Sequence, residues 1–215
     1  DNTTLFVANG LYKDTNKAYV VTNAEGLAKL NTMMADKSAG KNVVVNINAD
    51  IDFTGKTWTP VEGHFEFGFC LAEFDGNGHT LSNFYSSNNQ YQNSLFYFIE
   101  NAEIKNLKIT NAIIEQSDTT VSTYYSGCAV LVIWAISSEI NNCDISGSIT
   151  AGSFRNTAAG NPDYYSGVAG ICRSTSDTII TNCIADVDIS FTSTSVLSSN
   201  SGAAGLAASV TDGSI

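Results

Sequence analysis

Charged residues are scarce in this chain of 215 residues: they make up 14% of it, and only ten are lysine or arginine against 21 acidic residues. The formal net charge of −11 disfavours nucleic acid and anionic membranes as partners, because phosphate binding needs clustered basic side chains. The strongest apolar run, 128–136, is far shorter than the roughly 20 residues of a membrane-spanning helix. No transmembrane segment is therefore expected in this chain.

Cysteine is also scarce and odd in number, with five residues and no Cys-x-x-Cys pair. This pattern disfavours zinc and leaves at least one thiol unpaired within the chain. Gly-x-Ser-x-Gly, His-Glu-x-x-His and phosphate-binding loops are missing as well. The residues therefore predict no metal site and no other cofactor, although they do not exclude catalysis.

What the chain has instead is an internal repeat. Segments 126–146 and 166–190 both begin with Ser-Gly, reach an isoleucine after fourteen residues and continue with Asn-Cys. A further copy starts near 201 and a more divergent one near 94. A period of this length is typical of solenoids, in which each copy forms one coil.

Short alternating apolar runs in the copies predict strands rather than helices. Cys143 and Ile145 alternate with polar residues, as do the residues that follow Cys183. Alternation with period two is typical of a strand with one buried face. Ile140 and Cys143 are three residues apart, and a positive φ at Asn142 would return the next residue to the interior.

Stacking of the copies in register predicts a structural ladder of equivalent side chains. Its members are Ile104, Asn106, Ile140, Asn142, Cys143, Ile180, Asn182 and Cys183. We expect an all-β chain that forms a right-handed parallel β-helix, because right-handed crossovers between parallel strands are strongly favoured. The facing thiols of Cys143 and Cys183 are expected to be free, because parallel side-chain directions suit a disulfide poorly.

Residues 1–57 are predicted to form an N-terminal cap with short strands and an amphipathic helix over 23–36. Its apolar stripe includes Met33 and Met34, which could contact a partner but more readily cover the open end of the solenoid. Residues 58–215 are predicted to form the coils. Because Ile215 would open another Ile-x-Asn-Cys unit, we expect a truncated C-terminus and further coils or domains in a longer parent protein.

The repeat, together with WTPV at 58–61 and FDGNGHTL at 74–81, resembles the GLUG-type repeats of bacterial surface and secreted proteins. The resemblance spans 58–215, with departures at 128–130, where small residues are usual, and at the atypical turn 173–177. It implies a parallel β-helix that is secreted or on the cell surface, as in adhesins and in accessory regions of secreted peptidases.

A polar segment precedes each Ser-Gly. Insertions at one place in a repeat gather on one face of a solenoid, which is commonly the binding face. Two of them end in Tyr-Tyr-Ser-Gly, and the paired aromatic rings offer flat amphipathic surfaces to a sugar ring or simply shield the edge of the solenoid. The candidate ligand-binding residues are Tyr124, Tyr125, Tyr164 and Tyr165.

The acidic residues and histidines offer weaker candidates for catalysis. Asp50 and Asp52 share one face of a presumed strand, which suits glycoside hydrolysis or simply a solvated pair. His64 and His79 could supply a general base, although a place in turns is favoured. The segment 75–78 predicts a turn rather than a calcium loop, because no distal glutamate completes the ligand set.

These observations favour a non-catalytic adhesion or glycan-recognition module, with a glycan or a host-surface ligand as partner. Two alternatives remain open. A polysaccharide lyase or glycoside hydrolase of the β-helix type would need acidic and basic side chains clustered on adjacent coils. A passive structural stalk would show a bare face of serine, threonine and asparagine.

Overall fold

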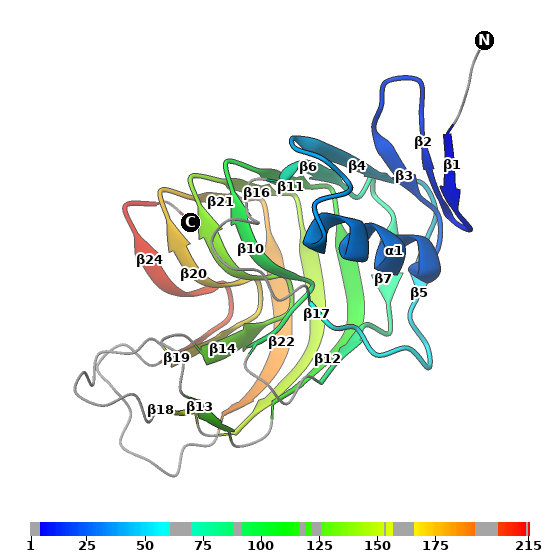
Figure 1. The fold of residues 1–215 in the computed structure, drawn as a ribbon. Helices are drawn as coiled ribbons and strands as arrows, with labels where there is room; N and C mark the ends of the chain where they lie inside the picture. Colours follow the sequence, from blue (N-terminus) through cyan, green and yellow to red (C-terminus); the bar gives the residue numbers. More distant parts are fainter. Residues whose placement is uncertain are drawn as a thin grey trace.

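The computed structural model describes residues 5–60, 70–87, 92–116, 119–121, 126–152, 154–156, 166–191, 202–213 and 215. Within these residues the regular structure consists of strands and one helix, and most strands pair in parallel (Figure 1). The predicted all-β class is confirmed, with sheets that are mainly parallel.

One sheet runs from the N-terminal strands through the strand that precedes the corner asparagine in the copies near 94, 126 and 166. Its strands, in spatial order, are β1 (Leu5–Ala8), β2 (Leu11–Lys13), β3 (Tyr19–Val21), β4 (Val43–Ile47), β6 (Leu71–Asp75), β11 (Glu103–Lys105), β16 (Glu139–Asn141) and β21 (Ile179–Thr181). Only its first two pairings are antiparallel.

A second sheet consists of β10 (Phe96–Glu100), β15 (Val132–Ile136), β20 (Cys172–Ser176) and β24 (Ala207–Thr211), which lie side by side in Figure 1. A third consists of β22 (Ile184–Phe191), β17 (Asp144–Ala151), β12 (Lys108–Gln116), β7 (Thr80–Ser82) and β5 (Ile51–Asp52), and β8 (Tyr85–Ser86) also pairs with β12. The remaining pairings join β23 (Gly202–Ala204), β19 (Ser166–Ala169), β14 (Ser126–Ala129) and β9 (Gln92–Asn93) in one group, and β13 (Thr119–Val121) with β18 (Phe154–Asn156) in another.

Equivalent residues of successive copies face each other across the strands. Ser126 pairs with Ser166, and Ile140 pairs with both Ile104 and Ile180. Beyond the asparagines, Asp144 pairs with Ile184. The repeat found in the sequence is therefore also the register of the sheets.

An asparagine with positive φ ends each of three strands. The φ angles of Asn106, Asn142 and Asn182 are 52°, 54° and 53°, at the ends of β11, β16 and β21. Asparagine adopts this left-handed conformation more easily than most residues. The turn places Leu107 and Cys143 in the interior although each lies three positions after a buried isoleucine.

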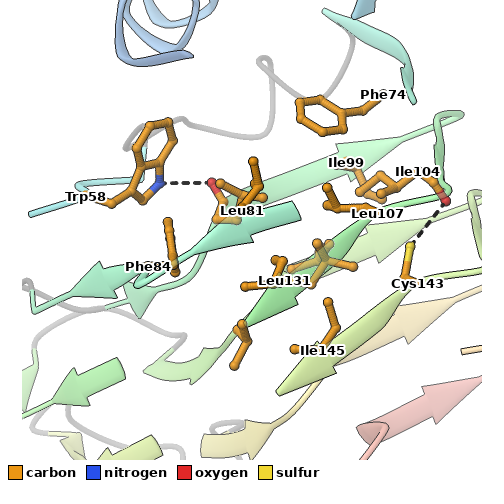
Figure 2. Packing of buried hydrophobic residues seen from close by; sticks show 14 of the residues in the cluster. Trp58, Phe74, Leu81, Phe84, Ile99, Ile104, Leu107, Leu131, Cys143 and Ile145 are labelled. Carbon is orange, nitrogen blue, oxygen red and sulfur yellow. Dashed lines mark hydrogen bonds between the residues drawn. The ribbon is translucent and has the colours of Figure 1, made fainter. Parts of the chain in front are cut away.

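The interior between the sheets is a single apolar core (Figure 2). Ile104, Ile140 and Ile145 are fully buried within it. Near the N-terminal part the core is aromatic: Phe53 meets Trp58 and Phe84 edge to face at centroid distances of 5.9 and 5.5 Å. The Trp58 indole N–H donates to the Leu95 carbonyl at 3.1 Å, so its polar atom is satisfied.

The helix α1 spans Ala24–Ala35, within the predicted range 23–36. Asn23 is its N-cap, and its side-chain oxygen accepts a hydrogen bond from the Gly26 N–H at 2.8 Å. Met33 and Met34 are partly buried and pack against the core, so the methionine stripe faces the protein's own interior. No helix in the described segments has the length and apolarity that a membrane crossing requires.

Candidate functional site: a cleft at Trp134

A cleft of about 250 Å³ lies on the sheet formed by β10, β15, β20 and β24. Ile99 and Ala135 of this sheet are buried in the core. Strand alternation therefore directs the neighbouring positions 134 and 136 to the opposite, outward face. The cleft is lined by Trp134, Ala135, Ile136, Ser174, Thr175, Ser176, Ser209 and Thr211.

The lining residues fall into two rows that cross the strands. In one row Trp134 pairs with Ser174, and Ser174 pairs with Ser209. In the other, Ile136 pairs with Ser176, and Ser176 pairs with Thr211. Because neighbouring strands lie about 4.8 Å apart, each row presents an apolar side chain followed by two regularly spaced hydroxyl groups.

The four hydroxyl groups in these rows are open to a ligand. Within the described segments, the side chains of Ser174, Ser176, Ser209 and Thr211 form no hydrogen bond. The first three residues are half-buried and Thr211 is exposed. None of the described residues that line the cleft carries a charge.

The indole of Trp134 is half-buried and is held by Arg173. The guanidinium carbon of Arg173 lies 5.2 Å from the centroid of the indole ring, within the range of a cation–π contact. Arg173 itself is only 1% exposed. A Cβ atom at Gly127 would lie 3.1 Å from both Cγ and Nε of Arg173, so the glycine leaves room for this side chain.

The four candidate tyrosines, Tyr124, Tyr125, Tyr164 and Tyr165, lie outside the described residues, and so does His64. The Trp134 cleft was missed by sequence reasoning, which treated 128–136 only as an apolar run. Val132 and Ile133 are both fully buried, and this hides the alternation that would have marked Trp134 as outward-facing.

The asparagines of the structural ladder form only part of a hydrogen-bonded stack. The Asn142 amide donates to Oδ1 of Asn106 at 2.8 Å, and the Asn106 amide donates to Oδ1 of Asp75 at 3.0 Å. The Asn182 amide instead donates to Oδ1 of Asn141 at 3.3 Å. The contacts are structural and bring no catalytic group together.

All five cysteines are free. Cys143 and Cys183 lie opposite each other, and the Cys143 backbone N–H donates to Sγ of Cys183 at 3.4 Å. Hydrogen bonding from the Cys143 thiol lowers the pKa of Cys183 below the ordinary value of a thiol. The same contact, reinforced by burial, raises the pKa of Cys143.

Asp50 and Asp52 both make hydrogen bonds that favour their ionised form. Asp50 Oδ1 accepts from the Thr80 N–H at 2.9 Å and lies 3.2 Å from Nδ1 of His79, and these contacts lower its pKa. The Asn83 amide and Thr54 lower the pKa of Asp52 in the same way. A general acid in glycoside hydrolysis needs a raised pKa, so neither carboxyl group suits that role.

The segment 75–78 forms a turn, as the sequence predicts. Oδ1 of Asp75 accepts from the Asn77 N–H at 2.7 Å, and the His79 N–H donates to the Gly76 carbonyl at 2.8 Å. In the part of the chain that the structure describes, no three His, Cys, Asp or Glu side chains gather in one place where they could hold a metal ion.

A second hollow, of about 60 Å³, lies between α1 and the core. Its lining is mainly apolar and includes Leu27, Trp58 and Phe96. The amide of Asn31 at this hollow already donates to the Thr59 carbonyl at 3.1 Å. With so few polar groups to orient a ligand, it is a weaker candidate than the Trp134 cleft.

By its fold and its cleft, the chain is an all-β protein with stacked parallel sheets and a surface depression whose described lining residues carry no charge. Comparison with protein-family models, curated proteins and solved structures finds no match for the chain.

Proposed function

We propose that the chain is a non-catalytic glycan-recognition or adhesion module, built on a right-handed parallel β-helix and belonging to a secreted or cell-surface bacterial protein with GLUG-type repeats. The observation that carries the functional part is the Trp134 cleft, where an indole lies in register with free hydroxyl groups. An aromatic face beside hydrogen-bonding groups matches the chemistry of a sugar, which has apolar ring faces and polar edges.

The path of the chain through the sheets supports the β-helix. The copy that begins at 126 passes through β14, β15, β16 and β17 in turn. The next copy passes through β19, β20, β21 and β22, and each of these strands pairs in parallel with its equivalent. The chain thus returns to the same four places once per copy, and right-handed coiling is the hand expected for such crossovers.

The alternatives have less support on the described surface. A hydrolase acting through Asp50 and Asp52 would lack a carboxyl group with a raised pKa. Arg173, one of two arginines in the chain, is buried beside Trp134 and so is poorly placed as the base of a lyase. A passive stalk accounts for the serine and threonine rows but gives no role to the cleft of about 250 Å³ beside the indole.

The experiment is to incubate the protein with a panel of host and plant polysaccharides and to measure both its retention and the release of new chain ends. Retention without new ends is the expected result. New chain ends would replace the proposal with an enzyme, and absence of both signals would favour the stalk.

The paired tyrosines remain a second prediction for the same function. If they bind the glycan, the double change Tyr124→Ala and Tyr164→Ala abolishes retention while the melting temperature stays nearly unchanged. Retention that survives the double change would make these tyrosines structural.

A further inference from the structure

We propose that the edge of β22 that faces away from β17 is a docking surface for an extended segment of a partner protein, in which apolar residues alternate with lysine or arginine. The segment would add one strand to the sheet of β22, β17 and β12. This inference does not depend on glycan recognition, because it uses another sheet and another class of ligand.

β22, the orange strand in Figure 1, is the last strand of its sheet among the described residues and pairs with β17 on its other side. With eight residues it is longer than β21, β23 and β24, the strands that end the other sheets in the last copies. The last strand of a sheet presents backbone groups that can pair with another chain.

The inward-facing residues of β22 are only partly covered. Ala185, Val187 and Ile189 are half-buried and pack against the core. Ile145 and Ile149, the partners of Ala185 and Ile189 on β17, are fully buried. Apolar surface is thus exposed at the end of the stack, and an added strand with apolar side chains at the matching positions would bury it.

The backbone groups of the same three residues point to the outer edge. The Ile184 N–H donates to the Cys143 carbonyl at 2.9 Å, so the backbone at position 184 faces the preceding copy. Along a strand, the N–H and C=O groups of successive residues point alternately to the two neighbouring strands. The N–H groups of Ala185, Val187 and Ile189 are therefore directed to the place that an added strand would occupy.

The outward positions of β22 specify the charge of the partner. Asp186 and Asp188 are exposed and alternate with the inward-facing residues. In the part of the chain that the structure describes, neither carboxylate takes part in an ion pair or a hydrogen bond. An added strand brings side chains directly opposite these two positions, where opposite charges are favourable. Lysine or arginine at both positions is the chemistry that matches them.

The same two carboxylates disfavour a second copy of this chain as the occupant. When two antiparallel β22 strands align their apolar positions, Asp186 of each copy lies opposite Asp188 of the other, and like charges in such pairs are destabilising. The net charge of −11 adds to this repulsion. Charged residues on edge strands commonly prevent self-association in this way. A basic strand turns the same charges into an attraction, so they select the partner.

The test measures the binding of fluorescein-labelled peptides to the full chain by fluorescence anisotropy. The matching probe is the peptide Thr-Val-Lys-Val-Lys-Ile-Thr. One control peptide has glutamate in place of both lysines, and the other contains the same residues in an order without alternation. The matching peptide should bind about tenfold more tightly than either control.

A proline variant locates the binding on β22. Val187→Pro removes an N–H directed at the added strand and leaves the hydrogen bonds to β17 intact, because proline is tolerated where the N–H of an edge strand faces solvent. It should abolish binding of the matching peptide while the melting temperature stays close to that of the wild type.

Val210→Pro is the matched control on β24. The Asp177 N–H donates to the Thr211 carbonyl at 3.0 Å, so the backbone of Thr211 faces β20 and that of Val210 faces away from it. Val210→Pro therefore removes an equivalent outward N–H from another edge strand. It should leave binding of the matching peptide unchanged.

Changes of charge test the chemistry of the partner. The double change Asp186→Asn and Asp188→Asn should weaken binding of the matching peptide by roughly fivefold, the factor that corresponds to ~1 kcal/mol for two cross-strand charge pairs. The double change to lysine should reverse the preference, so that the glutamate peptide binds instead. Glu139→Lys, at an exposed position on β16, should leave the preference for the lysine peptide unchanged.

The remaining outcomes would overturn the inference. They include no binding of the matching peptide, and binding that Val187→Pro leaves intact. Equal binding of the glutamate peptide would reject the basic partner. Self-association in analytical ultracentrifugation that Val187→Pro abolishes would make a second copy the occupant. Slow hydrogen exchange at Ala185, Val187 and Ile189 without peptide would show that the chain itself covers this edge.

Discussion

The side-chain amide of Asn142 donates a hydrogen bond of 2.8 Å to Oδ1 of Asn106, which lies 36 residues earlier in the chain. Both residues have a positive φ, and each directly follows one of two strands, β11 and β16, that pair in parallel in the same sheet. One residue type therefore serves two purposes at this corner: its backbone makes the turn and its side chain links neighbouring copies.

Substitution of Asn142 separates these two purposes. Asn142→Ala should lower the free energy of unfolding by about 2–3 kcal/mol, because it loses the hydrogen bond and strains a left-handed backbone. Asn142→Gly loses the same hydrogen bond without that strain, so its loss in free energy of unfolding should be about 1 kcal/mol smaller. Urea unfolding followed by circular dichroism measures both. Equal losses in the two variants would contradict the role of the positive φ.

Gly170 and Gly205 occupy the same position in two successive copies but have different surroundings. A Cβ at Gly170 would clash with the Gly205 carbonyl oxygen and lie 3.0 Å from Cβ of Ala185, whereas a Cβ at Gly205 meets nothing within 4 Å. Gly170→Ala should therefore lower the free energy of unfolding by about 1–3 kcal/mol. Gly205→Ala should be neutral or slightly stabilising, because it restricts the unfolded chain. A reversed order of melting temperatures would show that the last copies do not stack as described.

The isoleucine ladder should carry much of the stability. Ile140 is fully buried between Ile104 and Ile180, so Ile140→Ala should lower the free energy of unfolding by about 2–5 kcal/mol. Ile184 is 60% exposed, and Ile184→Ala should change it by no more than about 0.5 kcal/mol. Similar effects of the two variants on urea unfolding would argue against the register of the stacked copies.

Acid should weaken the stabilising contribution of the Asp52 carboxylate and its hydrogen bonds. Hydrogen bonds from Asn83 and Thr54 hold the pKa of Asp52 below its ordinary value of 3.8. The depressed pKa means that the ionised group stabilises the fold fully above pH 3.8, and that this contribution is lost as the pH falls through the folded-state pKa.

The variant Asp52→Asn tests that dependence. The difference in melting temperature between wild type and Asp52→Asn should be largest near neutral pH and should shrink as the pH falls below about 4. Asp186→Asn, at an exposed position on β22, removes an equal charge and serves as the control. A difference for Asp52→Asn that stays constant down to pH 2.5 would contradict the prediction.

The fold could be predicted from the sequence because the spacing of a few residues determines which positions of each strand face the interior. The Ile-x-Asn pattern at 140–142 and 180–182 marks both the buried position and the corner. Their pairing in register follows from burial, since a shift by one residue would expose the apolar face.

The cleft was not accessible in the same way, because it depends on residues that are distant in sequence. Trp134, Ser174 and Ser209 become neighbours only through the register of three strands. The pairing of His79 with Asp50, which lies 29 residues earlier, has the same origin. Nothing in the local sequence around Asn182 indicates that its amide bonds to Asn141 rather than to Asn142.

Cys183 should be the first thiol to react in the folded protein. It is half-exposed, whereas Cys70, Cys128, Cys143 and Cys172 are buried. Hydrogen bonding lowers the pKa of Cys183, and burial raises the pKa of Cys128 and Cys172 to about 12. Because the thiolate is the nucleophile, iodoacetamide should alkylate Cys183 alone. The rate of this alkylation should begin to rise at a lower pH than the alkylation rate of an ordinary thiol does.

Intact-mass analysis and peptide mapping between pH 5 and 9 would measure the alkylation of each cysteine. Cys183→Ser should leave the native protein unmodified, while denaturant should expose the other four thiols. Alkylation of Cys128 or Cys172 at the same rate as Cys183 would contradict the description of those residues as core side chains. Selective alkylation would instead show that the other four thiols are closed to the reagent, whereas Cys183 is accessible between β21 and β22, which are the last described strands of their sheets.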